Sequence, residues 1–273
     1  GSTTSYSFDA AGDRTATTGN ADATTASGFG VCLLATTGDA TLSATGAAEV
    51  TSTGVITDDS NSAAAIRATG SAAIAGTSVF SGGGAKTTGA AKIEPTPSAG
   101  TATDPDAGAT APAIAGAPAK LTVSGSKNVT AQPGVYSAIS VSGNARLTLA
   151  PGDYVLAGAD LTVSGSAELT GSGVTLYLTC ATYPIPCPTT DAKGSGVKVS
   201  GAARLTLTGS ADTDGISVLA DPNDDATITV AGSGAATVSG DVDIPAAGVS
   251  VTGNARFAVT GTLVANTAAV TGS

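Results

Sequence analysis

The chain has 273 residues, of which 41% are hydrophobic and only 3% aromatic, and it contains no Trp, Met or His. Its core must therefore be built from Val, Leu, Ile and Ala, and the lack of His excludes His-based metal sites and every Ser-His or Cys-His nucleophile pair. The formal net charge of −10 disfavours binding to nucleic acid or to an anionic membrane surface, because both need an excess of basic residues.

The first 27 residues are rich in Thr and Ala and carry few large apolar side chains. Gly1-Ser2 is typical of a cleavage scar, and we expect residues 3–27 to be a lead-in or a cap over the first coil of the fold. The chain contains no signal peptide and no apolar run of about 18 residues. We therefore expect an excised ectodomain, which would reach a membrane only through a segment outside this sequence.

From residue 28 onward the chain repeats one pattern, which is clearest over residues 121–130, 139–148 and 161–170. In each copy apolar residues alternate with Thr or Ser, the period-two signature of a strand with one buried face. Turn glycines measure the repeat: Gly143 follows Gly125 by 18 positions, and Gly165 follows Gly143 by 22 positions. Weaker copies occur at 41–46, 65–70 and 85–89, and further copies at 197–206 and 249–257.

A repeat of this length, made of short strands with glycine corners, predicts an all-β fold, a right-handed parallel β-helix with coils of about 18–24 residues. We expect one domain over residues 28–273. The Pro-rich stretch at 94–119 has the composition of a linker, but the repeat resumes after it, so we interpret it as a long excursion from one solenoid. We expect residues 3–27 and the C-terminal coil to cap the open ends of the stack.

The register of the repeat predicts two sets of stacked side chains. The inward set is an aliphatic ladder of Val123, Val141, Val163, Val199 and Val251. The outward set follows each turn glycine by three residues and consists of Arg146, Glu168, Arg204, Asp243 and Arg256. Because the signs in the outward set alternate, we interpret it as a structural charge ladder that controls register, worth about 0.2–1 kcal/mol for each pair.

The three cysteines fall into two groups. Six residues separate Cys180 from Cys187 in a Pro-rich loop, and we expect them to form a disulfide, which implies an oxidising compartment. Cys32 lies in an apolar run, so we interpret it as a small buried hydrophobic residue.

The repeated Val-Ser-Gly-Asn/Ser-Ala words, the Pro-Gly-x-Tyr turns that end at Tyr136 and Tyr154, and the stretches 171–180, 214–219, 242–253 and 263–272 carry a family resemblance. Over roughly residues 28–273 the chain resembles the ectodomain of Tad-type (tight adherence, Flp) pilus-assembly proteins of the TadE/TadG-like class. The resemblance implies an N-terminal membrane anchor and partners in the pilus machinery, and it supplies no catalytic residues.

Three candidate chemistries remain open beside a structural role. The acidic residues Asp212, Asp214, Asp221, Asp224 and Asp225 could supply oxygens to Ca²⁺, although their spacing is also normal turn chemistry. A carbohydrate-binding or carbohydrate-degrading β-helix would need paired carboxylates across a groove. Regular Thr positions on a flat face could bind ice, but the positions do not form a strict Thr-x-Thr pattern.

Because every strong signal in the sequence serves stacking and none serves chemistry, we expect a protein that is not an enzyme and needs no cofactor. We expect a cell-surface or pilus-associated module that presents a rigid face to pilus or cell-envelope proteins, to other copies of itself or to surfaces. The expected location is extracellular or in the bacterial cell envelope, and no nucleic acid is expected as a partner.

Overall fold

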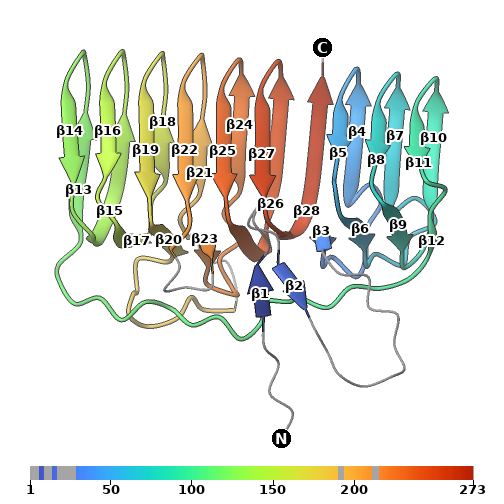
Figure 1. The fold of residues 1–273 in the computed structure, drawn as a ribbon, viewed down its shortest axis with the longest axis horizontal. Helices are drawn as coiled ribbons and strands as arrows, with labels where there is room; N and C mark the ends of the chain where they lie inside the picture. The colour runs from blue at the N-terminus through green and yellow to red at the C-terminus, as the bar shows by residue number, and fades with distance from the viewer. Residues whose placement is uncertain (1–5, 9–13, 17–28, 190–193, 211–214, 273) are drawn as a thin grey trace, which may run out of the picture.

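The computed structural model describes residues 6–8, 14–16, 29–189, 194–210 and 215–272. In these residues the fold is all-β, and its strands pair in parallel to form a β-solenoid, apart from one antiparallel pair, β1 (Tyr6–Phe8) with β2 (Arg14–Ala16). Figure 1 shows the coils as a row of stacked loops with the longest axis of the molecule running along the stack. The predicted parallel β-helix is confirmed.

Each coil contributes to up to three faces, and three long strands bend round a corner to serve two of them. The first face contains β3 (Phe29–Leu33), β6 (Val55–Asp58), β9 (Ser78–Ser81), β12 (Ser98–Ala99), β17 (Gly152–Ala157), β20 (Val174–Thr179), β23 (Ile216–Ala220) and the first halves of β15 (Gly134–Val141), β26 (Asp241–Gly253) and β28 (Leu263–Gly272).

The second face contains the second halves of β15, β26 and β28 together with β4 (Leu42–Gly46), β7 (Ile66–Gly70), β10 (Ala85–Gly89), β13 (Ala119–Val123), β18 (Leu161–Val163), β21 (Val197–Val199) and β24 (Ile228–Gly232). The third face consists of two separate sheets, one of β5 (Glu49–Thr51), β8 (Ala73–Ala75) and β11 (Lys92–Glu94), and one of β14 (Asn128–Ala131), β16 (Arg146–Leu149), β19 (Glu168–Ser172), β22 (Arg204–Thr208), β25 (Ala235–Ser239) and β27 (Arg256–Thr260).

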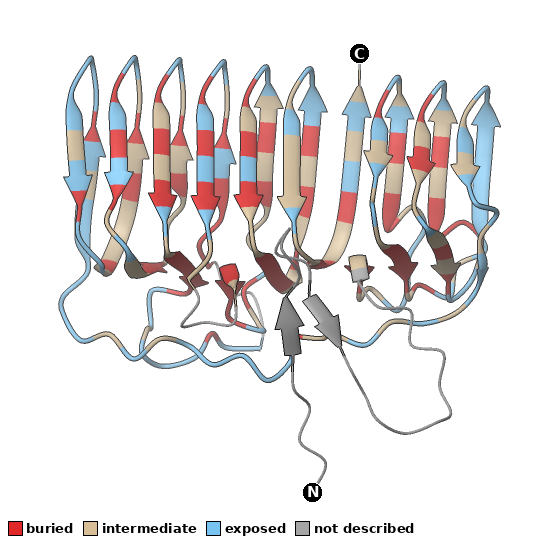
Figure 2. Ribbon diagram, viewed as in Figure 1, coloured by how far each residue is buried: buried red, intermediate tan, exposed pale blue. Residues whose placement is uncertain are grey.

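The core forms because alternation along each strand sends aliphatic residues inward at the same level in every coil. Strand pairing aligns Val123, Val141, Val163, Val199, Val230 and Val251 in succession, and all are buried. The predicted valine ladder is therefore confirmed, with Val230 as an additional member between Val199 and Val251. Figure 2 shows the alternation directly as buried and exposed bands along the strands.

Glycine is required at the corner between the second and third faces. Gly125, Gly143 and Gly165 adopt φ values of 73°, 74° and 74°, a left-handed conformation that costs other residues energy. The corners also stack closely, since a Cβ added to Gly165 would lie 3.0 Å from the carbonyl oxygen of Gly143. The repeating glycine of the sequence therefore marks both a turn and a close approach of neighbouring backbones.

The spatial order of the coils differs from their order in the sequence. β28, the last strand, pairs with β26 on one side and with β3 and β4 on the other. The coils built from residues 29–94 thus stack on the C-terminal strand, which lies in the middle of the row (Figure 1). The expected C-terminal cap is wrong, because β28 is held between two ladders. The other expected cap, residues 3–27, lies largely outside the described residues.

The Pro-rich stretch connects the two ends of the stack. It leaves the coil of β10 and β11 through β12 and runs beside the first face to β13, at the opposite end (Figure 1). Residues 100–118, which we call the strap, are held by Ala102 N–H, which donates to Asp59 Oδ1 at 2.5 Å, and by Tyr183 Oη, which donates to Pro112 O at 2.5 Å. Strands on both sides of this stretch belong to one sheet.

Candidate functional site

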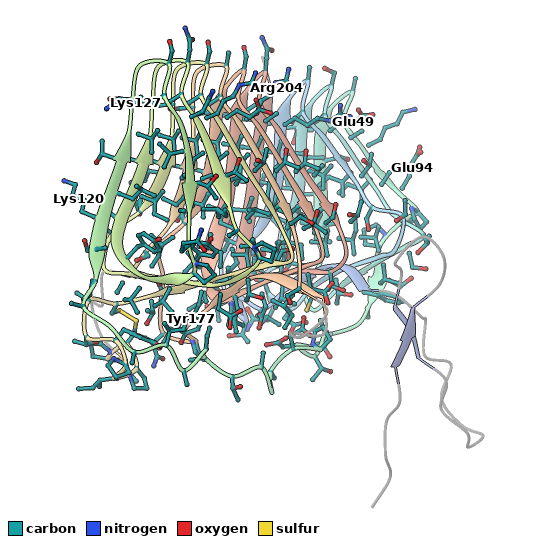
Figure 3. The ribbon with its side chains drawn as sticks, turned by 60° about the vertical axis from the view of Figure 1, so that its left-hand side comes forward. Glu49, Glu94, Lys120, Lys127, Tyr177 and Arg204 are labelled. Carbon is teal, nitrogen blue, oxygen red and sulfur yellow. A yellow bond between two sulfur atoms is a disulfide. The ribbon has the colours of Figure 1, made fainter. Side chains whose placement is uncertain are left out.

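The first face is covered on its outer side. The outward residues Val155, Tyr177 and Leu219 are buried in a second apolar cluster, against which Ile114 of the strap and Tyr183 of the disulfide loop pack. The strand residues of β20 and β23 are consequently buried on both sides. In Figure 3, Tyr177 lies beside these loops, whereas Arg204 and Glu49 lie near the opposite edge of the solenoid. Binding surfaces must therefore be sought on the second and third faces.

The larger sheet of the third face carries threonines at one level in five consecutive strands. Pairing of β14, β16, β19, β22 and β25 places Thr130, Thr148, Thr170, Thr206 and Thr237 at one level. Each alternates with inward aliphatic residues and points to solvent. Neighbouring members are about 4.8 Å apart, the strand spacing. We call this set the third-face threonine row.

The second face carries a matching row in the other half of the molecule. The residue before each corner glycine is Thr in five consecutive coils of the stack: Thr252, Thr271, Thr45, Thr69 and Thr88. All five are exposed or half-exposed. In sequence order they do not look like a row, because Thr271 and Thr45 are neighbours only through the pairing of β28 with β4. We call this set the second-face threonine row.

The charged row lies beside the third-face threonines and was predicted largely correctly. Arg146, Glu168 and Arg204 align in successive strands, and Arg146 Nη1 lies 3.2 Å from Glu168 Oε2. The next member is Ala235, followed by Arg256. The assignment of Asp243 to this row is wrong: Asp243 lies on the first face, in β26, and is buried. The spacing rule fails here because the coil with its corner at Gly232 has Ala231 and Ala235 where other coils carry polar residues.

In its described part, the acidic loop that suggested a Ca²⁺ site makes hydrogen bonds to the backbone of neighbouring loops. Asp221 Oδ2 accepts a hydrogen bond from Cys187 N–H at 3.1 Å, and Asp224 Oδ2 accepts one from Ser195 N–H at 2.9 Å. Both carboxylates are buried, so they act as turn acceptors, and Asp225 is exposed. Asp212 and Asp214 lie outside the described residues. Within the described ranges, no group of three Asp, Glu, Cys or His side chains is placed to hold a metal ion.

A small cavity of about 200 Å³ lies between the strap and the first face. It is lined by Asp104, Asp106, Tyr177 and Asp243, together with small apolar residues. Asp243 Oδ1 is buried and has no hydrogen-bond partner among the described residues. Burial, together with the negative charges of Asp104, Asp106 and Asp241, raises the pKa of Asp243 to about 8. At neutral pH Asp243 is therefore mostly a neutral carboxylic acid.

The cysteines behave as predicted. Cys180 and Cys187 form a disulfide, which closes the loop that carries Tyr183. Cys32 is fully buried, and its pKa is raised to about 12 by burial and then by the charge of Asp59. Its thiol is therefore unreactive. The stacked pair of Tyr136 and Tyr154, whose ring centroids are 5.9 Å apart, is structural as well.

Comparison with known proteins adds no further constraint on these surfaces. No family model, curated protein sequence or solved structure matches the chain. The described residues contain no helix long and apolar enough to cross a membrane.

Proposed function

We propose that the protein is a non-catalytic surface module, of the cell envelope or of a pilus assembly, that binds protein partners or surfaces through its flat second and third faces. The two threonine rows carry this proposal. They place small hydroxyl groups at a fixed repeat on the faces whose outward residues are exposed. β-branched side chains on a rigid sheet lose little conformational freedom on binding, so such a face is preorganised for a repetitive partner.

Two further observations fit this role. The disulfide between Cys180 and Cys187 is typical of proteins that work in an oxidising compartment such as the cell exterior or the periplasm. The resemblance to Tad-type pilus-assembly ectodomains suggests pilus components as partners. Self-association belongs to the same proposal, because the outermost strands at either end of the stack, β10 and β13, each pair on one side only.

Cosedimentation with purified Tad-type pilus filaments, together with adsorption to silica and polystyrene, tests the proposal. The double variant Thr148→Glu/Thr206→Glu changes the third face, and Thr45→Glu/Thr271→Glu is the matched change on the second face. We expect one pair to lower binding by about tenfold or more, because each added carboxylate must be desolvated in the interface, while the other pair leaves binding unchanged. No binding by the wild-type protein, or equal binding by all three proteins, would refute the proposal.

Ice is a second candidate ligand, favoured by the regularity of the same threonine rows. A flat face with hydroxyl groups at about 4.8 Å intervals can hold ordered water in a lattice. Thermal hysteresis at micromolar protein, abolished by one of the two double variants, would support ice binding. Freezing-point behaviour identical to that of an unrelated acidic protein would exclude it.

A further inference from the structure

A buried carboxyl group interrupts the apolar row on the outer side of the first face. Strand pairing places Tyr177, Leu219, Asp243 and Val264 at one level, and all four are buried. The neighbouring coils therefore have an aromatic or aliphatic side chain where β26 has Asp243. A buried carboxyl group lowers stability unless it is paired, and Asp243 Oδ1 has no hydrogen-bond partner among the described residues. A costly group at a position that accepts an apolar residue in the adjacent coils indicates a binding role.

The strap brings two more acidic side chains to the same place. Asp104 and Asp106 line the cavity of about 200 Å³ together with Asp243. Asp106 N–H donates to Asp104 Oδ1 at 2.8 Å, and Ala109 N–H donates to Asp106 O at 2.7 Å, so a hydrogen-bonded turn fixes this part of the strap. Among the described residues that line the cavity there is no Lys or Arg. The cavity thus gathers three acidic groups without a basic side chain in its wall.

The rest of the wall is aliphatic and small. It consists of Leu219 and six Ala and Pro residues: Ala107, Ala109, Ala111, Ala220, Pro222 and Pro245. The three alanines of the strap are exposed to solvent, so a single thickness of chain separates the cavity from water. Its volume is below the roughly 300–1,000 Å³ of pockets for drug-sized ligands. A ligand that fits must therefore be small, with a cationic head and an apolar body.

An ammonium group suits this arrangement better than a metal ion. A bound Ca²⁺ or Mg²⁺ needs several oxygens within about 2.0–2.6 Å of one centre, and no three acidic side chains of the described residues are placed in that way. A primary ammonium group has three N–H donors, and each can reach a different carboxylate at about 2.7–2.9 Å. The methylene chain behind it can contact an aliphatic wall.

We propose that this cavity binds a primary alkylammonium group, which donates hydrogen bonds to Asp243 and to the strap carboxyl groups and lays its alkyl chain against the small aliphatic residues. A free alkylamine and the lysine side chain of a partner protein share this chemistry. The attraction is strengthened because the cavity is partly shielded from water, where opposite charges interact more strongly than in bulk solvent. The site is separate from the threonine rows, so either proposal can fail alone.

Binding should depend on pH through Asp243. The other titratable groups close to its carboxyl are Asp104 and Asp106 of the strap, Asp241 of the same strand, Tyr177 of β20 and Cys32 of β3. Burial raises the pKa values of Tyr177 and Cys32 to about 12, so both stay neutral near pH 7. With a pKa of about 8, Asp243 must release its proton when the ammonium group binds. Affinity should therefore rise from pH 6 to pH 8, by at most about tenfold per pH unit.

Titration calorimetry of the intact protein with n-butylamine in phosphate buffer tests the proposal. The amine stays protonated up to a pKa near that of Lys, about 10.4. A ligand this small binds no tighter than about micromolar, so the titration extends into the millimolar range. We expect saturable binding that is at least about tenfold stronger than that of 1-butanol, which has the same shape but no charge. The absence of saturable binding, or equal binding of the two compounds, would overturn the proposal.

The variant Asp243→Asn keeps the shape of the side chain and removes its charge. It should weaken n-butylamine binding by about tenfold or more and abolish the rise between pH 6 and pH 8, while the exposed Asp225→Asn, which makes the same change in net charge outside the cavity, should alter neither. Asp104→Asn is a second cavity variant, at a half-exposed position that tolerates substitution. Melting temperatures identify the folded variants, and binding unaffected by a folded Asp243→Asn or Asp104→Asn would refute the site.

A second titration distinguishes the two sources of the ammonium group. Nα-acetyl-lysine methylamide carries the same alkylammonium chain on a peptide-like backbone. If it binds as tightly as n-butylamine, and Asp243→Asn weakens both, the cavity accepts a lysine side chain of a partner. If only n-butylamine binds, the cavity accepts free amines alone.

Discussion

Asp243 shows how a single buried carboxyl group couples stability to pH. Its side chain lies in the cavity beneath the strap, faces Asp104, Asp106 and Asp241, and has a pKa raised to about 8, mainly by burial. A carboxyl whose folded-state pKa lies above its unfolded value stabilises the fold when it is protonated. Below its ordinary pKa, near pH 4, that contribution is fully present, and it is lost as the pH rises towards 8.

We therefore predict that Asp243→Asn is more stable than the wild type at pH 8 and that the difference shrinks at pH 5. The wild type should lose at most about 1.4 kcal/mol of unfolding free energy per pH unit over this interval relative to the variant. Urea unfolding at both pH values measures the difference, with the exposed Asp225→Asn as control. A difference between Asp243→Asn and the wild type that does not change with pH would contradict this account of Asp243.

At the scale of the elements, the corner glycines allow the chain to turn from the second face to the third at the same level in every coil. Gly165→Ala places a Cβ at a φ of 74° and 3.0 Å from Gly143 O. We expect it to lower the unfolding free energy by about 1–2 kcal/mol or more. Gly108→Ala is the control, since an added Cβ there meets nothing within 4 Å, and its effect should stay within about 0.5 kcal/mol. Thermal unfolding of both variants measures the two losses of stability. Equal melting temperatures for Gly165→Ala and Gly108→Ala would contradict the role given to the corner glycine.

The strap is the second element whose attachment can be tested. Tyr183 Oη donates to Pro112 O and accepts from Ile114 N–H at 3.0 Å. Tyr183→Phe removes both hydrogen bonds and should cost about 1 kcal/mol, with faster amide exchange at Ile114. Tyr136→Phe, which removes a single hydrogen bond to Gln132 O, is the control and should leave exchange in the strap unchanged. Unaltered exchange at Ile114 in Tyr183→Phe would show that the disulfide loop does not hold the strap.

Much of each element could be predicted from sequence, because the residues of one coil are enough to specify its strands and its corner. The alternation in Leu147-Thr148-Leu149 and the glycine at position 143 specify a strand, its buried face and its corner without reference to other coils. The order of the coils could not be predicted in this way. All copies share one pattern, so each is compatible with any neighbour, and nothing local indicates that Thr271 lies beside Thr45.

The surfaces were harder to predict than the strands for the same reason. The second-face threonine row exists only because the coils of residues 29–94 stack on β28. The prediction for Asp243 was wrong because it treated Gly240 as a corner glycine. The glycine that forms the corner before β25 is Gly232, with a φ of 72°. Charge spacing therefore predicted the row Arg146–Glu168–Arg204 but failed where the repeat itself is degenerate.

At the scale of the whole molecule, the central claim is that the strap spans the stack and lets the first coils close on the last strand. The claim fixes the distance between two residues that precede corner glycines, Thr88 and Ser124. They lie in the coils on either side of the strap in sequence but at opposite ends in space. Nine ladder steps separate them along the second face.

Electron–electron double resonance on the spin-labelled double variant Thr88→Cys/Ser124→Cys tests this claim most directly. Buried Cys32 and the bridged Cys180 and Cys187 should not take up label. Nine steps of about 4.8 Å predict a backbone separation of about 43 Å, to which the label linkers add their own spread. A distribution centred below about 20 Å, as for coils adjacent in the stack, would contradict the coil order, and with it the second-face threonine row.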